Sequence, residues 1–321
     1  MRRRRFLQLC AVAAVSPSLA RGAFALDYPA RPVRIVVPYP PGIAPDIVAR
    51  LVAQALSERF KQQFVVDNRP GGASNIGTSI VAHAPPDGYT LLVVTTTNTI
   101  NTSLYDNLDF NLVRDIAPVA GLVRLNLVLA VHPSVPAQTL PEFIAYAKKN
   151  PGKINYASVG SGAATNVAGE LFKEMAAINL VNVPYRSSYM PDLIGGQVQA
   201  AFTPILQSVE YIKAGKLRAL AVTGAMRSES LPGIPAAAEF VPGYAAYVWD
   251  AVGAPVKTPA DIVAALNSEI NAVLSQPTMQ AQFAALGAEP MLMTPAEFGK
   301  YIAEETEKWG RVVRTARIKV D

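Results

Sequence analysis

The chain alternates short apolar runs with stretches of helical periodicity, and this alternation limits the folds open to it. Residues 33–37 (VRIVV) form a nearly continuous β-branched run, typical of a strand buried on both faces, and the breaker PYPPG follows at 38–42. From Asp46 onward, apolar residues recur at helical spacing. Strands that alternate with helices predict mainly parallel sheets flanked by helices, which is an α/β fold.

The same alternation continues to the end of the chain. We expect further strands at residues 64–67, 89–94, 154–157, 180–183, 198–202 and 217–222. Capping boxes predict helix starts at Thr139 with Glu142, Thr258 with Asp261, and Thr294 with Glu297. A chain of 321 residues is long enough that one core usually divides into two, so two domains are expected.

Residues 1–25 have the three parts of a secretory signal peptide. An arginine-rich start precedes an apolar run at 7–15, and AFA at 23–25 predicts cleavage after Ala25 and export of the mature protein. The apolar run is too short to span a bilayer, so no membrane insertion of the mature chain is expected. The paired arginines before Phe6 resemble a twin-arginine signal, and the general secretory route is the alternative.

The excess of basic residues belongs to this N-terminal segment. The chain has 29 Lys and Arg against 24 Asp and Glu, but residues 1–25 hold five arginines and no acid, which leaves 24 of each sign. A mature chain of zero net charge gives no support for nucleic-acid binding. The single cysteine, Cys10, also lies in this segment, so the mature chain has no disulfide and no thiolate metal site.

Candidate binding residues lie in the loops after buried strands, because open α/β sheets bind ligands beyond the carboxyl ends of their strands. Three such loops stand out, at 39–46, 95–98 and 158–166. The first and third lead into helices, whose N-termini would bind an anion through backbone N–H groups. The candidates are Tyr39, Pro41, Gly42, Ile43, Ala44, Asp46, Thr95, Thr97, Asn98, Ser161, Gly162, Ala163, Ala164 and Thr165. Ordinary turn chemistry is the alternative for any one loop.

Other chemistries have weaker support. The GSG at 160–162 lacks the third glycine and the acidic residue of a dinucleotide site, and it lacks the elbow of a serine hydrolase. His83 and His132 are isolated and are expected to be structural, so we predict no metal site, no cofactor and no catalytic residue. We also expect Trp249 and Trp309 in the core and Glu305 on the solvated face of the last helix.

Six segments in order resemble the substrate-binding proteins of tripartite tricarboxylate transporters, the Bug family. They are PARPVRIVVP (29–38), NRPGG (68–72), APPDGYTLL (84–92), AGELF (168–172), DLIGGQV (192–198) and IKAGKLRALAV (212–222). The resemblance implies a two-lobed periplasmic-binding-protein fold that closes on a small carboxylate and delivers it to membrane permease subunits. It implies a monomer with lobe 1 at 27–127 plus 249–321, lobe 2 at 128–248, and hinges near 127–132 and 247–253.

The chain departs from the family pattern at positions that bear on specificity. The first loop reads PGIAPD at 41–46 where the family has Pro-Gly-Gly-x-Thr-Asp, and Asn166 replaces a histidine. Tyr185 and Thr203 are further candidate binding residues. The loop after Tyr185 is shorter than in the family, and Thr203 stands where the family has an aspartate. An ammonium group would lose its partner at Thr203, so we expect a mono- or dicarboxylate, aliphatic or aromatic, without an amino group.

Three functions remain open at this point. The leading one is a non-enzymatic periplasmic receptor that supplies a transporter. A sensory receptor that presents its ligand to a signalling partner is the second. An exported hydrolase that uses Ser161 is the third, and loss of turnover in Ser161→Ala would favour it.

Overall fold

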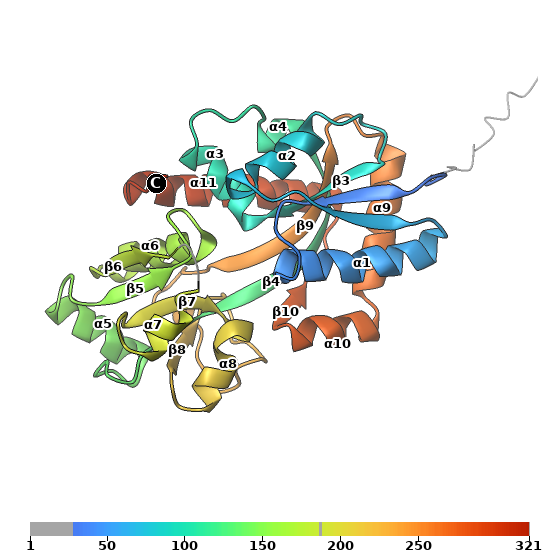
Figure 1. Cartoon of the computed structure of the whole chain (residues 1–321). Coiled ribbons are helices and arrows are strands. Elements are labelled where there is room, and N and C mark those ends of the chain that lie inside the picture. The colour runs from blue at the N-terminus through green and yellow to red at the C-terminus, as the bar shows by residue number, and fades with distance from the viewer. Residues whose placement is uncertain (1–27, 186–187, 321) are drawn as a thin grey trace, which may run out of the picture.

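The computed structural model describes residues 28–185 and 188–320, and strands and helices alternate along them (Figure 1). The strands are β1 (Val33–Val37), β2 (Phe64–Asn68), β3 (Thr90–Thr95), β4 (Ile116–Val131), β5 (Asn155–Ser158), β6 (Val181–Pro184), β7 (Ala200–Pro204), β8 (Arg218–Val222), β9 (Tyr247–Pro255) and β10 (Ala288–Pro290). The α/β class is confirmed, and each predicted strand is present within two residues of its expected position.

Helices connect most of these strands. They are α1 (Ala44–Phe60), α2 (Asn75–Ala82), α3 (Thr96–Leu104), α4 (Leu112–Asp115), α5 (Leu140–Lys149), α6 (Ala164–Ala176), α7 (Met190–Ile194), α8 (Ile205–Lys213), α9 (Ala260–Leu274), α10 (Pro277–Ala285) and α11 (Pro295–Thr315), with 3-10 turns η1 (Gly72–Ser74) and η2 (Ala237–Glu239). All three candidate loops lead into helices, α1, α3 and α6.

The sheet is mixed, with parallel pairs at its ends and antiparallel pairs in its middle. The strand order is β2-β1-β3-β9-β4-β7-β5-β6, and β8 and β10 also pair with β4. β1 pairs in parallel with β2 and β3, and β5 with β6 and β7. The long strands β4 and β9, which the sequence pattern did not predict, run antiparallel to their neighbours.

Strand β4 is shared by two lobes. Its residues 116–126 pair with β9 and β10, and its residues 127–131 pair with β7 and β8. Figure 1 shows β4 and β9 passing between the lobe that holds β1 to β3 and the lobe that holds β5 to β8. The carboxyl ends of β1, β3, β5 and β7 therefore come from different lobes.

Apolar clusters cover both faces of each lobe. In the first lobe, α1, α9 and α10 pack on one face of the sheet, and α2, α4 and α11 pack on the other. In the second lobe, α5 and α6 cover one face and α7 and α8 the other. The predicted core positions of Trp249 and Trp309 are confirmed, since both are fully buried.

Of the three predicted capping boxes, the one at Thr294 forms in both directions. The one at Thr139 forms only in part, because the Glu142 carboxylate accepts from the Gln138 N–H. The Thr139 and Thr294 hydroxyls accept hydrogen bonds from the N–H groups of Glu142 and Glu297. The third prediction was wrong, because α9 begins at Ala260 and the Thr258 hydroxyl donates to the Pro255 carbonyl oxygen at 2.7 Å.

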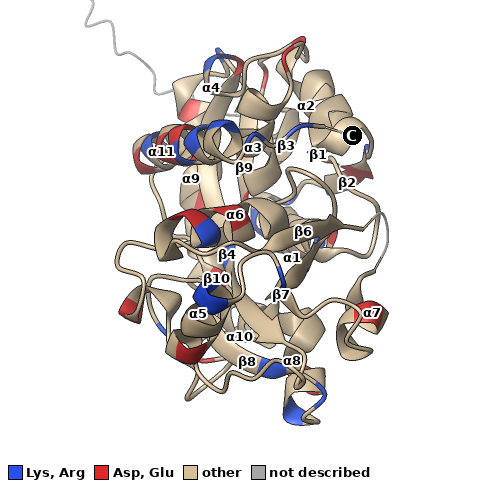
Figure 2. Ribbon diagram, turned by 90° about the vertical axis from the view of Figure 1, so that its left-hand side faces the viewer, with Lys and Arg blue, Asp and Glu red and all other residues tan. Residues whose placement is uncertain are grey.

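Charged residues of both signs are interspersed on the surface, as α11 shows (Figure 2). Lys300 and Glu304 lie one turn apart on this helix, 3.7 Å from nitrogen to oxygen. Within the described ranges, 28–185 and 188–320, no helix has the length and apolar character needed to cross a membrane.

Candidate functional site

The first loop is held by Asp46. Gly42 has a φ of +86°, which favours glycine, and its N–H donates to Asp46 Oδ2 at 2.8 Å. The same carboxylate accepts from Asn68 Nδ2 at 2.9 Å and Arg50 Nε at 3.0 Å. Burial acts to raise the pKa of Asp46, but these hydrogen bonds hold it below its ordinary value. Gly42 and Asp46 are thus bonded to each other within the loop.

The third loop repeats this arrangement in the second lobe. Gly162 has a φ of +77°, and its N–H donates to Asn166 Oδ1 at 3.1 Å. Asn166 Nδ2 donates in turn to the Tyr156 hydroxyl at 3.0 Å, and that hydroxyl donates to Glu170 at 2.7 Å. A glycine followed four residues later by an Asp or Asn therefore closes both loops.

The two helix N-termini differ in the donors they offer. The first N–H groups of a helix have no acceptor within it. In α6 these belong to Ala164 and Thr165. In α1 the corresponding residues are Ala44 and Pro45, and proline has no N–H. The first two residues of α6 consequently present one more backbone donor than those of α1.

The second loop is a capping box. Asn98 Oδ1 accepts from the Thr95 N–H at 2.7 Å, and Asn98 Nδ2 donates to the Thr78 hydroxyl at 2.8 Å. The Thr95 hydroxyl lies 3.1 Å from the hydroxyl of Tyr39, so the first and second loops are in contact. Thr97 is partly exposed beside them.

The remaining candidates divide into exposed and buried groups. Pro41 and Ile43 are exposed, and Ser161 and Ala163 are partly exposed. Tyr185 is partly exposed and donates to Asp192 Oδ2 at 2.7 Å; burial and this hydrogen bond raise the pKa of Tyr185 to about 12. Thr203 is fully buried at the end of β7, on the α7 and α8 side of the sheet.

The prediction missed Asp250, a buried carboxyl on β9. It is 1% exposed, and neither carboxyl oxygen has a hydrogen-bond partner among the described residues. Burial raises the pKa of Asp250 to about 7. It lies opposite Thr95 in the antiparallel pairing of β3 and β9. Only that long-range pairing brings it to the candidate site.

Several contacts join the two lobes around these loops. Leu104, at the end of α3, packs so closely on Gly162 that a Cβ there would lie 2.2 Å from its Cδ2. Arg311 of α11 donates to Glu174 of α6 at 2.7 Å. The loop regions of the two lobes thus adjoin.

Glu305 corrects the expectation of a solvated position. It is 6% exposed, and its Oε2 accepts from the indole nitrogens of Trp249 at 3.0 Å and Trp309 at 2.8 Å. Lys308 forms an ion pair with the same carboxylate. Glu305 therefore ties strand β9 to the last helix.

The two histidines contact neighbouring groups outside the loops. His83 Nδ1 lies 2.9 Å from the Ser79 carbonyl oxygen, and His132 Nδ1 lies 2.8 Å from the Ser134 hydroxyl. Among residues 28–185 and 188–320, no three His, Cys, Asp or Glu side chains are grouped as metal ligands.

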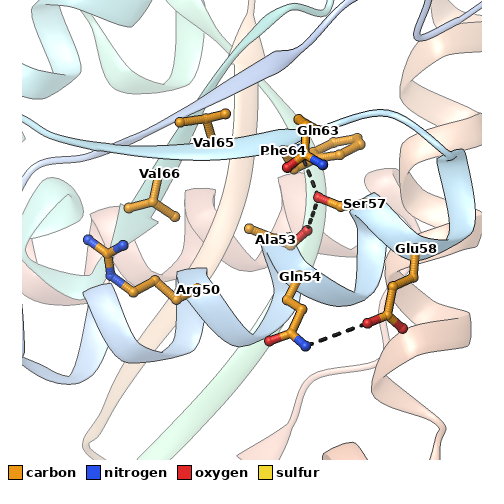
Figure 3. A pocket seen from close by; sticks show the side chains of 9 residues that line it. All are labelled: Arg50, Ala53, Gln54, Ser57, Glu58, Gln63, Phe64, Val65 and Val66. Carbon is orange, nitrogen blue, oxygen red and sulfur yellow. Dashed lines mark hydrogen bonds between the residues drawn. The ribbon is translucent and has the colours of Figure 1, made fainter.

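A groove of about 590 Å³ lies away from the candidate loops, between α1 and the edge strand β2 (Figure 3). Its lining residues are Arg50, Ala53, Gln54, Ser57, Glu58, Gln63, Phe64, Val65 and Val66. None of the predicted site residues lines it, so it is separate from the loops at the strand ends.

The chain matches known receptors along nearly its whole length. A family model described as the tripartite tricarboxylate transporter family receptor matches residues 48–318. Protein BugT of Bordetella pertussis (strain Tohama I) is 35% identical and covers 98% of each chain. A UPF0065 protein of Pseudomonas sp. (strain P51) is 34% identical, over 99% of this chain and 96% of the relative.

Solved structures agree with these matches. Rpa4515 of R. palustris with adipate is 35% identical with a TM-score of 0.80, over 92% of this chain and 100% of that one. MatC of Rhodopseudomonas palustris with bound malate is 28% identical with a TM-score of 0.74, over 89% and 100%. The chain belongs to the tripartite tricarboxylate transporter receptor family.

Proposed function

We propose that the protein binds a small carboxylate without an amino group between its lobes and presents it, as a monomer, to the permease subunits of a tripartite tricarboxylate transporter. The hinge would lie where β4 changes partners, near the predicted limits of 127 and 249. Residues 1–25, predicted as a cleaved export signal, lie outside the described residues. The receptor family supports the periplasmic location of the mature chain.

The observation that carries this proposal is the repeated loop at the N-termini of α1 and α6. Each contains a glycine whose N–H donates to an Asp or Asn side chain of the following helix. The N–H groups at the first positions of that helix have no acceptor within it. A carboxylate is stabilised there by these donors and by the helix dipole. Adipate and malate, the ligands of two similar receptors, are both carboxylates.

We expect the ligand to lack an amino group because neither nearby carboxyl, Asp46 or Asp250, is available to pair with an ammonium. The Asp46 carboxylate already accepts hydrogen bonds from Gly42, Arg50 and Asn68. Asp250 is buried, which favours its neutral form. An ammonium group buried here would lack an unpaired carboxylate to bind, because Asp46 is already paired with Arg50, and such burial is unfavourable by several kcal/mol.

Replacement of Ala164 by proline tests the backbone donors directly. Proline is tolerated at the first position of a helix, and Ala163 before it is already extended, with a ψ of 155°. The substitution removes one N–H without breaking α6. A charge-assisted hydrogen bond contributes about 1.5–3 kcal/mol, so Ala164→Pro should weaken adipate or malate binding by tenfold or more in calorimetric titration.

Ala260→Pro is the matched control, since Ala260 is the exposed first residue of α9. Ala260→Pro should bind adipate or malate like the wild type.

Native mass spectrometry of protein purified without refolding would identify a retained solute. Tighter binding of aspartate than of its des-amino analogue succinate would contradict the proposed ligand class, and equal affinities of Ala164→Pro and wild type would contradict the proposed site.

A further inference from the structure

Asp250 lies on the same face of the first-lobe sheet as the first candidate loop. Val252 and Ala254, its alternate neighbours on β9, pack in the cluster of α1, α9 and α10. Because successive side chains of a strand point to opposite faces, Asp250 points to the α1 side as well. Trp249 points the other way, into the cluster of α2, α4 and α11.

Thr95 connects Asp250 to the candidate site. Residues directly opposite each other in an antiparallel pair have neighbouring side chains on one face. Thr95 is the partner of Asp250 in this pairing, and it is the last residue of β3. The hydroxyl of Tyr39, from the first loop, lies 3.1 Å from the Thr95 hydroxyl. Tyr39 thus lies over the end of β3, where Asp250 of β9 is the paired residue.

The surroundings of Asp250 leave its carboxyl without a polar partner. Both oxygens are buried and unbonded among the described residues. A buried polar group without a hydrogen bond destabilises the fold unless something else satisfies it. On β4 the facing residue is Val123, which is apolar. A group with these properties beside a ligand site is suited to a polar group of the ligand.

We propose that Asp250 forms part of the ligand site, reached when Tyr39 moves off Thr95, and that it selects carboxylates bearing a hydroxyl group. This inference rests on the proposed carboxylate-binding function. A neutral carboxyl both donates and accepts, and a hydroxyl does the same, so the two groups satisfy each other. A hydroxyl is also less strongly hydrated than an ammonium, so its transfer into the closed site is less unfavourable.

Malate and succinate are suitable probes because they differ by one hydroxyl. Calorimetric titration at one pH should give malate an affinity at least tenfold higher than succinate in the wild type, since a site that hydrogen-bonds a hydroxyl disfavours the analogue without it. Asp250→Asn retains a donor and an acceptor and should keep most of this preference. Asp250→Leu, of similar size and apolar, should bring the two affinities together.

Asp261→Leu, at an exposed position on α9, is the control and should behave as the wild type. Thermal unfolding checks that each variant is folded. Three outcomes would overturn the role of Asp250 without contradicting carboxylate binding. They are equal binding of malate and succinate by the wild type, binding of adipate alone, and a malate preference that persists in Asp250→Leu. Binding of none of the three diacids would contradict the proposed function and this assignment together.

Discussion

Asp46 and Asn166 have the same structural role in the two lobes, with different chemistry around them. Asp46 is ionised and bonded to Arg50, whereas Asn166 is neutral and bonded to the Tyr156 hydroxyl. Both side chains lie four residues after a loop glycine, so the local sequence is sufficient to place them. Glu305 and Asp250 differ in this respect, because their surroundings come from distant segments.

Asp250 predicts a pH dependence of stability. Its pKa is raised by burial to about 7 from an ordinary value of 3.8, so the native state binds more protons than the unfolded chain between these values. Stability should therefore fall as pH rises from 4 to 7, by as much as about 4 kcal/mol. Urea unfolding should find Asp250→Asn more stable than the wild type at pH 8, and the difference should shrink at pH 5.

Asp261→Asn is the control for this comparison, because Asp261 is exposed. It should follow the wild type at both pH values. A difference between Asp250→Asn and the wild type that is the same at pH 5 and pH 8 would show that the Asp250 carboxyl does not titrate in this range.

At the scale of elements, the loops before α1 and α6 each depend on a glycine with positive φ, whereas the loop before α3 has none. Gly42 and Gly162 both have this geometry, but a Cβ on Gly42 would meet nothing within 4 Å, while one on Gly162 would meet Leu104. The two loops are therefore alike in backbone conformation and different in packing.

Alanine substitution separates these two effects. Gly42→Ala should lower the free energy of unfolding by about 1 kcal/mol, through backbone strain alone. Gly162→Ala should lower it by about 2 kcal/mol, because the Leu104 side chain must also shift. Denaturant unfolding measures both values. The Leu104→Ala background should remove the additional loss, and an undiminished difference there would contradict the packing explanation.

At the scale of the whole molecule, the lobes share one strand and touch through side chains. Arg311 and Glu174 form an ion pair between α11 and α6 in which both side chains are substantially exposed, at 51% and 34%. Such exposed ion pairs stabilise the form that contains them by about 0.2–1 kcal/mol. This is enough to change the ratio of closed to open forms up to about fivefold.

Charge reversal should move this balance without a ligand. Arg311→Glu places two carboxylates together and should increase the radius of gyration in small-angle scattering. Arg311→Glu combined with Glu174→Arg restores opposite charges and should return the radius to the wild-type value. The same radius in all three proteins would mean that this pair does not hold the lobes together.

The local pattern was sufficient to predict β1, the helices α1 and α6 after the first and third candidate loops, and the family to which the chain belongs; it did not predict α3. Buried parallel strands are continuous apolar runs, and glycine, proline and capping residues mark loop geometry within a few positions. The candidate loops before α1, α3 and α6 were found in this way.

The tertiary structure alone decided the mixed sheet, the sharing of β4 and the environments of Glu305 and Asp250. Strand pairing and burial depend on residues that are far apart in sequence, as Asp250 and Thr95 are. Neither a carboxylate in a polar helix nor one in a strand has a sequence mark of its eventual burial. Desolvation arises only when the chain has packed around them, so the surroundings of these two side chains were decided by the fold.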